Sequence, residues 1–340
     1  MTRFQKLADN VLKGISLTRE EALEILATPQ SQILELVNSA YTIRSKYFGN
    51  TVRLQMLLNA KSGACQEDCH YCSQSTISNA PIDRYALLSP EKMMEGARRA
   101  ADAKAQRYCI VISGRSPLQS EITQISSAVK KIKEEIPIQI CCSLGLLNGE
   151  QANQLKDAGV DRINHNLNTS EAFHPSICTT HTFQDRLDTL KHARAAGLEL
   201  CSGGIVGMGE RDEDLVDLAL SLKEVQPDSI PLNMLYPVDG TPFGEKNNLT
   251  PARCLIILCL FRFLHPQTEI RAAGGREKNL RSLQPLALYV ADSLFVDGYL
   301  TTPGLAHQEV WKMIEDMGFT VEVDYQSPKN ENLQAESCST

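Results

Sequence analysis

The chain has 340 residues and a formal net charge of −7, and this acidic balance gives no support for binding to nucleic acid or to an anionic membrane surface. Hydrophobic residues make up 42% and charged residues 22% of the sequence, proportions that favour a folded globular protein over a disordered one. The N-terminus carries scattered charges and no apolar leader, so we expect the eleven cysteines to be metal ligands, reactive thiols or core residues in a cytoplasmic protein rather than disulfides.

The first 50 residues are predicted to form a helical extension. Thr18 stands ahead of Glu20 and Glu21, and an apolar stripe follows, which is the pattern of a capped helix N-terminus. Further along, the apolar run 254–265 is too short to cross a bilayer and is interrupted by Arg262, so we expect it to be a buried helix face.

From residue 51 onward, short apolar or β-branched runs alternate with amphipathic stretches typical of helices. The runs are 52–60, 107–113, 137–145, 162–169, 198–207, 229–235, 269–275 and 293–300. This alternation predicts an α/β fold, a (β/α)8 TIM-type barrel over residues 51–325, with its site at the carboxyl ends of the strands. An open doubly wound sheet is the alternative, and the lack of a G-x-G-x-x-G motif after the first run disfavours it. The polar segment 326–340 is expected to be a disordered tail.

Three cysteines follow the first predicted strand at close spacing. Cys65, Cys69 and Cys72 form a C-x3-C-x2-C motif with His70 inside it. Zinc bound by the three thiols and His70 is one interpretation, but structural zinc sites usually take their ligands from two separated pairs. A [4Fe–4S] cluster is favoured, because such clusters use closely spaced thiolates. Three thiolates would leave one iron open to a substrate or cofactor.

This motif resembles that of the radical S-adenosylmethionine (AdoMet) superfamily, with Tyr71 as the aromatic residue before the last cysteine. The resemblance implies that AdoMet binds the open iron and that an electron from the cluster cleaves it to a radical able to abstract hydrogen from unactivated carbon. A hydrogenase maturase of the same superfamily is an alternative function. A non-catalytic iron–sulfur or zinc protein is a second alternative, from a different class.

The alternation of side chains along strands predicts a second group of thiols inside the barrel. On three runs it turns Cys109, Cys141 and Cys201 inward while apolar neighbours face the helices. Each cysteine alone would be interpreted as a small core residue, but three together suggest a second metal centre. Arg271 also falls on an inward face, where an arginine would ordinarily bind an anion or pair with an acid.

Asparagines recur on one face of another run. Asn164, Asn166 and Asn168 alternate within 162–169, and Asn233 has inward parity on a later run. Carboxamides offer a donor and an acceptor together, which suits a cyclic urea, whereas a satisfied polar layer is the alternative interpretation.

Several motifs in the same order, over roughly residues 40–320, resemble the biotin synthase family. They are "SGACQEDCHYC", "NHNLNTS", "CSGGIVGMGE", "IPLNML", "AGGRE" and "LTTPG". The resemblance implies sulfur insertion into dethiobiotin to give biotin. It also implies a [2Fe–2S] cluster that donates the sulfur and is held by Cys109, Cys141, Cys201 and Arg271.

The same resemblance implies how substrate and cofactor are bound. Asn164 and Asn233 would hold the ureido ring of dethiobiotin, and Asn166 would lie between the substrate and AdoMet. Asn168 stands where many relatives have an aspartate that contacts the AdoMet ribose, and we expect the contact to survive with altered strength.

Three further AdoMet contacts are implied in the same way. Tyr71 belongs to the AdoMet site, Arg186 would pair with the AdoMet carboxylate, and Ile205, in "GGIVGMGE", would pack on the adenine. The family is usually homodimeric, and its electron donor would be a flavodoxin- or ferredoxin-like protein.

Overall fold

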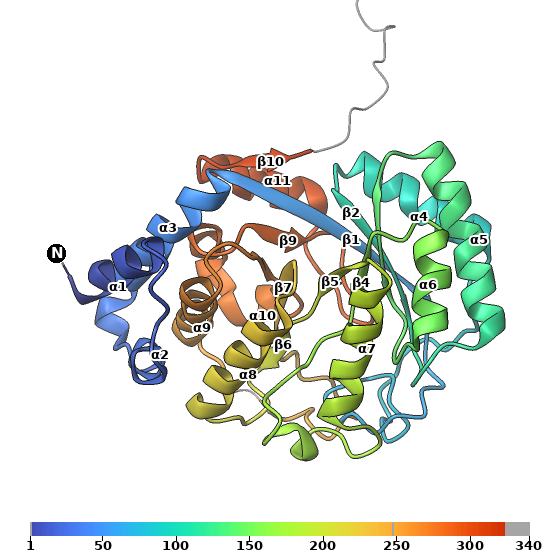
Figure 1. Ribbon diagram of the computed structural model, residues 1–340, viewed down its shortest axis with the longest axis horizontal. Coiled ribbons are helices and arrows are strands. Elements are labelled where there is room, and N and C mark those ends of the chain that lie inside the picture. Colours follow the sequence, from blue (N-terminus) through green and yellow to red (C-terminus); the bar gives the residue numbers. More distant parts are fainter. Residues whose placement is uncertain (1, 247, 324–340) are drawn as a thin grey trace, which may run out of the picture.

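The computed structural model describes residues 2–246 and 248–323, which form a barrel with helices around it and a helical segment on one side (Figure 1). The predicted tail, residues 326–340, lies outside the described residues. No helix within the described ranges combines the length and the apolar character that a membrane crossing requires.

Eight parallel strands close into a ring, which confirms the predicted TIM-type barrel. They are β1 (Thr51–Lys61), β2 (Arg107–Ile112), β3 (Gln139–Ser143), β4 (Arg162–Asn164), β5 (Glu199–Cys201), β7 (Ser229–Met234), β8 (Glu269–Ala272) and β9 (Ser293–Phe295). Each strand pairs with the next in this order, and β9 also pairs with β1, so the ring has no free edge.

Three details differ from the prediction. The run 198–207 forms two short strands, β5 and β6 (Gly204–Val206), and they are interrupted at Gly203, where a Cβ would lie 2.0 Å from the Pro231 carbonyl oxygen. The run 162–169 is regular strand only as far as Asn164, and Asn168 has a left-handed φ of 72°. A short strand that was not predicted, β10 (Thr320–Glu322), pairs with the start of β1.

Helices follow the strands and cover the outside of the barrel (Figure 1). They are α4 (Pro90–Asp102), α5 (Gln119–Glu135), α6 (Gly149–Asp157), α7 (Phe183–Ala195), α8 (Asp212–Val225), α9 (Pro251–Leu264), α10 (Arg276–Leu280) and α11 (His307–Asp316). The apolar run predicted as a buried helix face is α9, where the fully buried Arg262 is paired with Asp292 at 2.5 Å. Short 3₁₀ helices lie at η2 (His174–Ser176) and η3 (Arg281–Tyr289).

The N-terminal residues form α1 (Arg3–Leu12), α2 (Arg19–Leu26), the 3₁₀ turn η1 (Gln30–Gln32) and α3 (Ile33–Phe48). The predicted cap of α2 is present, because Thr18 Oγ1 accepts from the Glu21 amide at 3.2 Å and Glu21 accepts from the Thr18 amide at 2.8 Å. These helices pack beside α9 and leave the cavity of the barrel free.

Candidate active site

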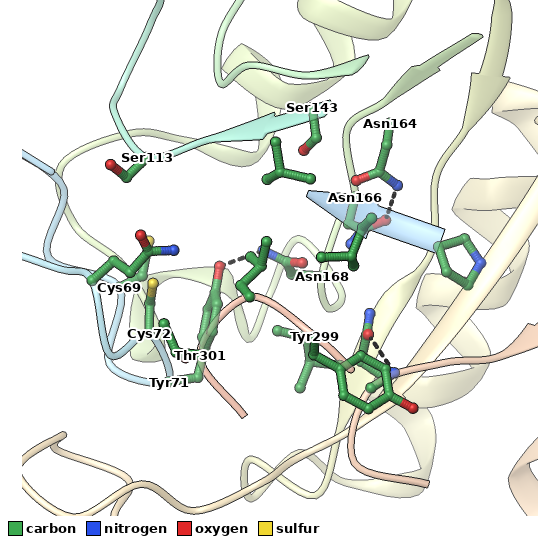
Figure 2. A pocket seen from close by; sticks show the side chains of 18 of the residues that line it. Cys69, Tyr71, Cys72, Ser113, Ser143, Asn164, Asn166, Asn168, Tyr299 and Thr301 are labelled. Carbon is green, nitrogen blue, oxygen red and sulfur yellow. Dashed lines mark hydrogen bonds between the residues drawn. The ribbon is translucent and has the colours of Figure 1, made fainter. Parts of the chain in front are cut away.

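One cavity of about 400 Å³ opens within the barrel, and the residues predicted to bind the clusters, AdoMet and the substrate line it. Figure 2 shows part of this lining. The candidates are Cys65, Cys69, Tyr71, Cys72, Cys109, Cys141, Asn164, Asn166, Asn168, Arg186, Cys201, Ile205, Asn233 and Arg271. The strand alternation used to predict the inward residues is therefore the one that the barrel adopts. Tyr108, on the opposite face of β2, instead packs against Gly96 of α4.

The C-x3-C-x2-C motif lies on the loop after β1, which we call the cysteine loop (residues 62–76). The loop is braced by its own chain, since the Gly63 amide donates to Gln74 Oε1 at 3.1 Å and the Thr76 amide donates to the Glu67 carbonyl at 2.9 Å. Burial raises the pKa of the Cys72 thiol to about 11. A bound metal cation would reverse that shift by stabilising the thiolate.

The cysteine loop is tied to the segment 174–182, between β4 and α7, mainly through one carboxylate. Asp68 accepts hydrogen bonds from the backbone amides of Thr179 at 2.9 Å and Thr180 at 3.2 Å, and from the hydroxyl groups of both threonines. Burial alone would raise the pKa of Asp68, but these donors outweigh it and hold the pKa well below its ordinary value. Asp68 therefore remains an anion that holds the two segments together.

Cys178 lies within this contact. Its sulfur is 3.7 Å from Cys69 Sγ and 3.2 Å from His181 Nδ1, and Glu67 contacts the same ring nitrogen. No local pattern in the sequence indicates this arrangement, because Cys178 and Cys69 are 109 positions apart in the chain. Cys178 is 1% exposed, and the S–H of Cys69 together with His181 lowers its pKa to about 4 against the opposing effect of burial.

The second group of thiols lies deeper in the barrel. Cys109 on β2 and Cys141 on β3 are register partners, and Cys201 lies on β5 with its sulfur 3.5 Å from Arg271 Nη1. The S–H of Cys109 bonds to Cys141 and lowers the pKa of Cys141, and the nearby guanidinium groups of Arg162 and Arg271 act in the same direction. The three thiols and Arg271 therefore converge on one buried, cationic region.

A buried charge network adjoins these thiols. Glu269 contacts Arg107 at 3.4 Å, Arg162 at 3.1 Å and Arg271 at 2.5 Å, and it also accepts from Gln55 at 2.7 Å. Burial would raise the pKa of Glu269, but the three arginines hold it well below the ordinary value. Glu269 and Arg271 are two residues apart on β8 and therefore share a face, whereas the contacts of Glu269 with β2 and β4 depend on how the barrel closes.

The asparagines form a row between the two groups of thiols. Asn164 Nδ2 lies 3.3 Å from Cys201 Sγ and 3.2 Å from Asn166 Oδ1, while Asn168 Nδ2 donates to the Tyr71 hydroxyl at 2.5 Å (Figure 2). Tyr71 is the residue before Cys72, so the row connects the second group of thiols with the cysteine loop.

Some polar groups at the cavity have partners and others lack them. Asn166 Oδ1 accepts from the Gly203 amide at 3.2 Å, and Asn233 bridges the Gly204 carbonyl and the Gly274 amide. Within the described residues, Arg186 Nε and the Nε2 atoms of His165 and His181 are buried without a hydrogen-bond partner. These groups suit a polar ligand with several acceptors, as AdoMet is, and the two groups of sulfur ligands suit iron–sulfur clusters.

Comparison with known proteins agrees with this chemistry. Residues 60–222 match the Radical SAM superfamily, and residues 231–320 match the Biotin and Thiamin Synthesis associated domain. The chain is 52% identical over 322 residues to "Biotin synthase" of Bacillus subtilis strain 168, with 95% of this chain and 96% of the relative covered.

Two solved structures share the fold at low sequence identity. Methylornithine synthase has a TM-score of 0.82 at 19% identity, covering 93% of this chain and 97% of the other. The hydrogenase maturase HydG from Carboxydothermus hydrogenoformans has a TM-score of 0.79 at 19% identity, covering 94% and 79%. The high identity over nearly the full length sets the biotin synthase relatives apart from these, and the chain belongs to the biotin synthase family of the radical SAM superfamily.

Proposed function

We propose that this chain inserts sulfur into dethiobiotin to form biotin. The observation that carries the proposal is that two groups of thiols open onto one cavity and that a row of asparagines joins them. A substrate bound along this row would have one end of its reacting region near the cysteine loop and the other near Cys201. Placing hydrogen removal and sulfur delivery within one cavity is the main task of such an enzyme, because a reactive carbon must meet one partner only.

Two sets of residues would hold the metal cofactors. The first set, Cys65, Cys69 and Cys72, would hold a [4Fe–4S] cluster. The second set would hold a [2Fe–2S] cluster and consists of Cys109, Cys141, Cys201 and Arg271. When bound, the first cluster and AdoMet supply the hydrogen abstraction, and the second cluster supplies the sulfur.

The remaining cavity residues would bind and orient AdoMet. Arg186 would pair with its carboxylate, because the guanidinium group is buried and its Nε has no hydrogen-bond partner in the described part of the chain. Ile205 would pack on the adenine, and Asn168 together with Tyr71 would bind the ribose side. In the present geometry Asn168 and Tyr71 bond to each other, so each offers only part of its hydrogen-bonding capacity to a ligand.

Asn164 and Asn233 would bind the ureido group of dethiobiotin. Asn164 directs its Nδ2 to Cys201 Sγ at 3.3 Å, and Asn233 is fixed by backbone groups on both sides of its carboxamide. Asn166 would lie between substrate and AdoMet. Its side-chain oxygen accepts from the Gly203 amide, and its backbone carbonyl oxygen accepts from Arg186 Nη1 at 2.8 Å. An electron donor of the flavodoxin or ferredoxin type, a homodimeric state and a cytoplasmic setting complete the proposal.

An anaerobic assay of the iron-reconstituted chain with AdoMet, dithionite and dethiobiotin tests this function. Mass spectrometry should detect biotin and 5′-deoxyadenosine, with more 5′-deoxyadenosine in the presence of dethiobiotin than in its absence. Formation of 5′-deoxyadenosine that dethiobiotin does not stimulate, without biotin, would overturn the substrate assignment. Neither product from iron-loaded protein would overturn the radical AdoMet assignment as well.

A further inference from the structure

Cys69 has a close sulfur neighbour that is not part of the C-x3-C-x2-C motif. Cys178, on the segment 174–182, is buried with Cys69 in a small core cluster that also contains Met208 and Phe243. The two Sγ atoms are 3.7 Å apart, although the residues are separated by 109 positions in the chain. The pair is therefore created by the packing of two loops.

A ring nitrogen completes a set of three converging ligand atoms. Cys69 Sγ, Cys178 Sγ and His181 Nδ1 all lie within 4.8 Å of one another, and the Cys178–His181 separation is 3.2 Å. In a tetrahedral zinc site with Zn–S bonds of about 2.3 Å, two sulfur ligands lie roughly 3.8 Å apart. The observed sulfur–sulfur distance matches that edge closely.

Carboxylates next to these atoms can supply the fourth ligand. Glu67 contacts His181 Nδ1, and Asp68 Oδ1 lies 3.1 Å from Cys178 Sγ. Glu67 is 5% exposed, so its carboxylate is held inside the same buried region. Two sulfurs, one imidazole and one carboxylate oxygen form a donor set that zinc prefers over hard cations such as Mg²⁺.

We propose that Cys69, Cys178 and His181, with the carboxylate of Glu67 or Asp68, form a Zn²⁺ site. Zinc binding requires both sulfurs as thiolates, so it displaces the proton that Cys69 donates to Cys178, and it fastens the cysteine loop to the segment 174–182. Because Cys69 belongs both to this set and to the C-x3-C-x2-C motif, zinc and the first iron–sulfur cluster exclude each other. This last consequence rests on the proposed function, whereas the zinc site itself does not.

The test uses the full-length chain with Cys65→Ala and Cys72→Ala, which removes the competing motif and keeps the three proposed ligands. Zn²⁺ is titrated against a chromophoric chelator, and the thiols that zinc protects from iodoacetamide are mapped by mass spectrometry. We expect Cys69 and Cys178 to be protected together. Adding Cys178→Ala should weaken the zinc affinity by at least about 100-fold, because loss of even an indirect partner of a metal ligand costs roughly 10- to 100-fold.

Two further variants in the same background keep the test decisive. Cys259→Ala removes a fully buried thiol of α9 that contributes no ligand, and it should leave zinc affinity unchanged. His181→Gln should weaken zinc binding without removing either thiol, so it tests the site even if Cys178→Ala does not fold. Protection confined to Cys109, Cys141 and Cys201, or an affinity that neither Cys178→Ala nor His181→Gln changes, would overturn the proposal. Because these variants lack the cysteine motif, the result does not depend on whether the chain makes biotin.

Discussion

Arg271 contacts one thiol inside the barrel, that of Cys201, and the buried acid beside it. Its Nη1 lies 3.5 Å from Cys201 Sγ, and its Nη2 bonds to Glu269 at 2.5 Å and to Ser229 at 2.9 Å. Burial would lower the pKa of Arg271, but Glu269 and Cys201 outweigh it and the pKa is raised. In this geometry Arg271 acts as a cation beside Cys201, so ligation of a metal through its nitrogen would require the metal to displace a proton.

The function of the second group of thiols is tested by Cys141→Ala. Removing this sulfur should keep reductive cleavage of AdoMet, which depends on the cysteine loop, and should reduce biotin formation by at least about 100-fold, equivalent to roughly 2.7 kcal/mol or more. Cys142→Ala is the matched control, because Cys142 is the next residue, is fully buried and packs in the main core on the other face of β3. Normal biotin yield from Cys141→Ala would show that the second cluster is not held there.

At the scale of single residues, the sequence predicted which side chains enter the cavity but not how they are partnered. The inward positions of Cys109, Cys141 and Asn233 follow from strand alternation, which depends only on local backbone geometry. The contact of Cys178 with Cys69 could not be predicted, because it depends on how a long loop folds back on another loop.

At the scale of elements, the cysteine loop depends on the segment 174–182 for its position. The ties are the hydrogen bonds that Asp68 accepts from Thr179 and Thr180, together with the bond from the His70 amide to the Ile177 carbonyl at 3.0 Å. The loop has no regular secondary structure of its own, so these contacts replace the support that a helix or strand would give.

Asp68→Ala should therefore loosen the cysteine loop without touching a thiol. We expect the iron of the first cluster to be lost to a chelator about 10-fold faster, and the free energy of unfolding to fall by about 2–3 kcal/mol, since several donors lose a charged acceptor. Asp68→Asn, which keeps one acceptor oxygen, should lie between the variant and the parent. Asp83→Ala, at an exposed carboxylate between β1 and α4, is the control.

Iron release that is equally fast in the Asp68 and Asp83 variants would contradict this role. A loss of stability in Asp68→Ala without faster iron release would also contradict it, because the carboxylate would then support the fold without positioning the loop.

At the scale of the whole molecule, one buried carboxylate links strands around the barrel. Glu269 on β8 is hydrogen-bonded or ion-paired to Gln55 on β1, Arg107 on β2, Arg162 on β4 and Ser229 on β7. Removing one negative charge would leave several buried guanidinium groups without sufficient counter-charge. The network therefore stabilises the closed ring of strands. It also sets the balance of charge beside the thiols.

Glu269→Gln should lower the free energy of unfolding at neutral pH by about 3–5 kcal/mol, measured by urea denaturation. Because the folded pKa of Glu269 is depressed, its stabilising contribution is present above the unfolded pKa of about 4.3 and is lost as the pH falls below that value. The difference between parent and variant should therefore shrink on acidification. Glu224→Gln, at an exposed position of α8, should change stability by less than about 0.5 kcal/mol. Equal stability of the two glutamine variants at neutral pH would contradict the role of the network.

The sequence predicted the barrel because the eight apolar runs and the helices between them follow a regular order. The prediction is wrong at positions where tertiary packing, rather than the local sequence pattern, decides the structure. Gly203 interrupts the run 198–207 since the backbone of β7 approaches it closely, and the three residues of β10 are too few to show an alternation. The charge network could not be predicted, because strand register decides which charged side chains of different strands meet inside the barrel.

Isotope transfer tests whether the cluster held by the second group of thiols delivers sulfur to a substrate in the shared cavity. The second cluster is assembled with heavy-isotope sulfide, excess sulfide is removed, and a single turnover with dethiobiotin and AdoMet is analysed by mass spectrometry. We expect biotin that carries the heavy sulfur, at a yield no greater than one per second cluster, and loss of this product in Cys141→Ala. Biotin of ordinary mass, formed while the heavy sulfide stays bound to the protein, would contradict delivery of sulfur from the second cluster.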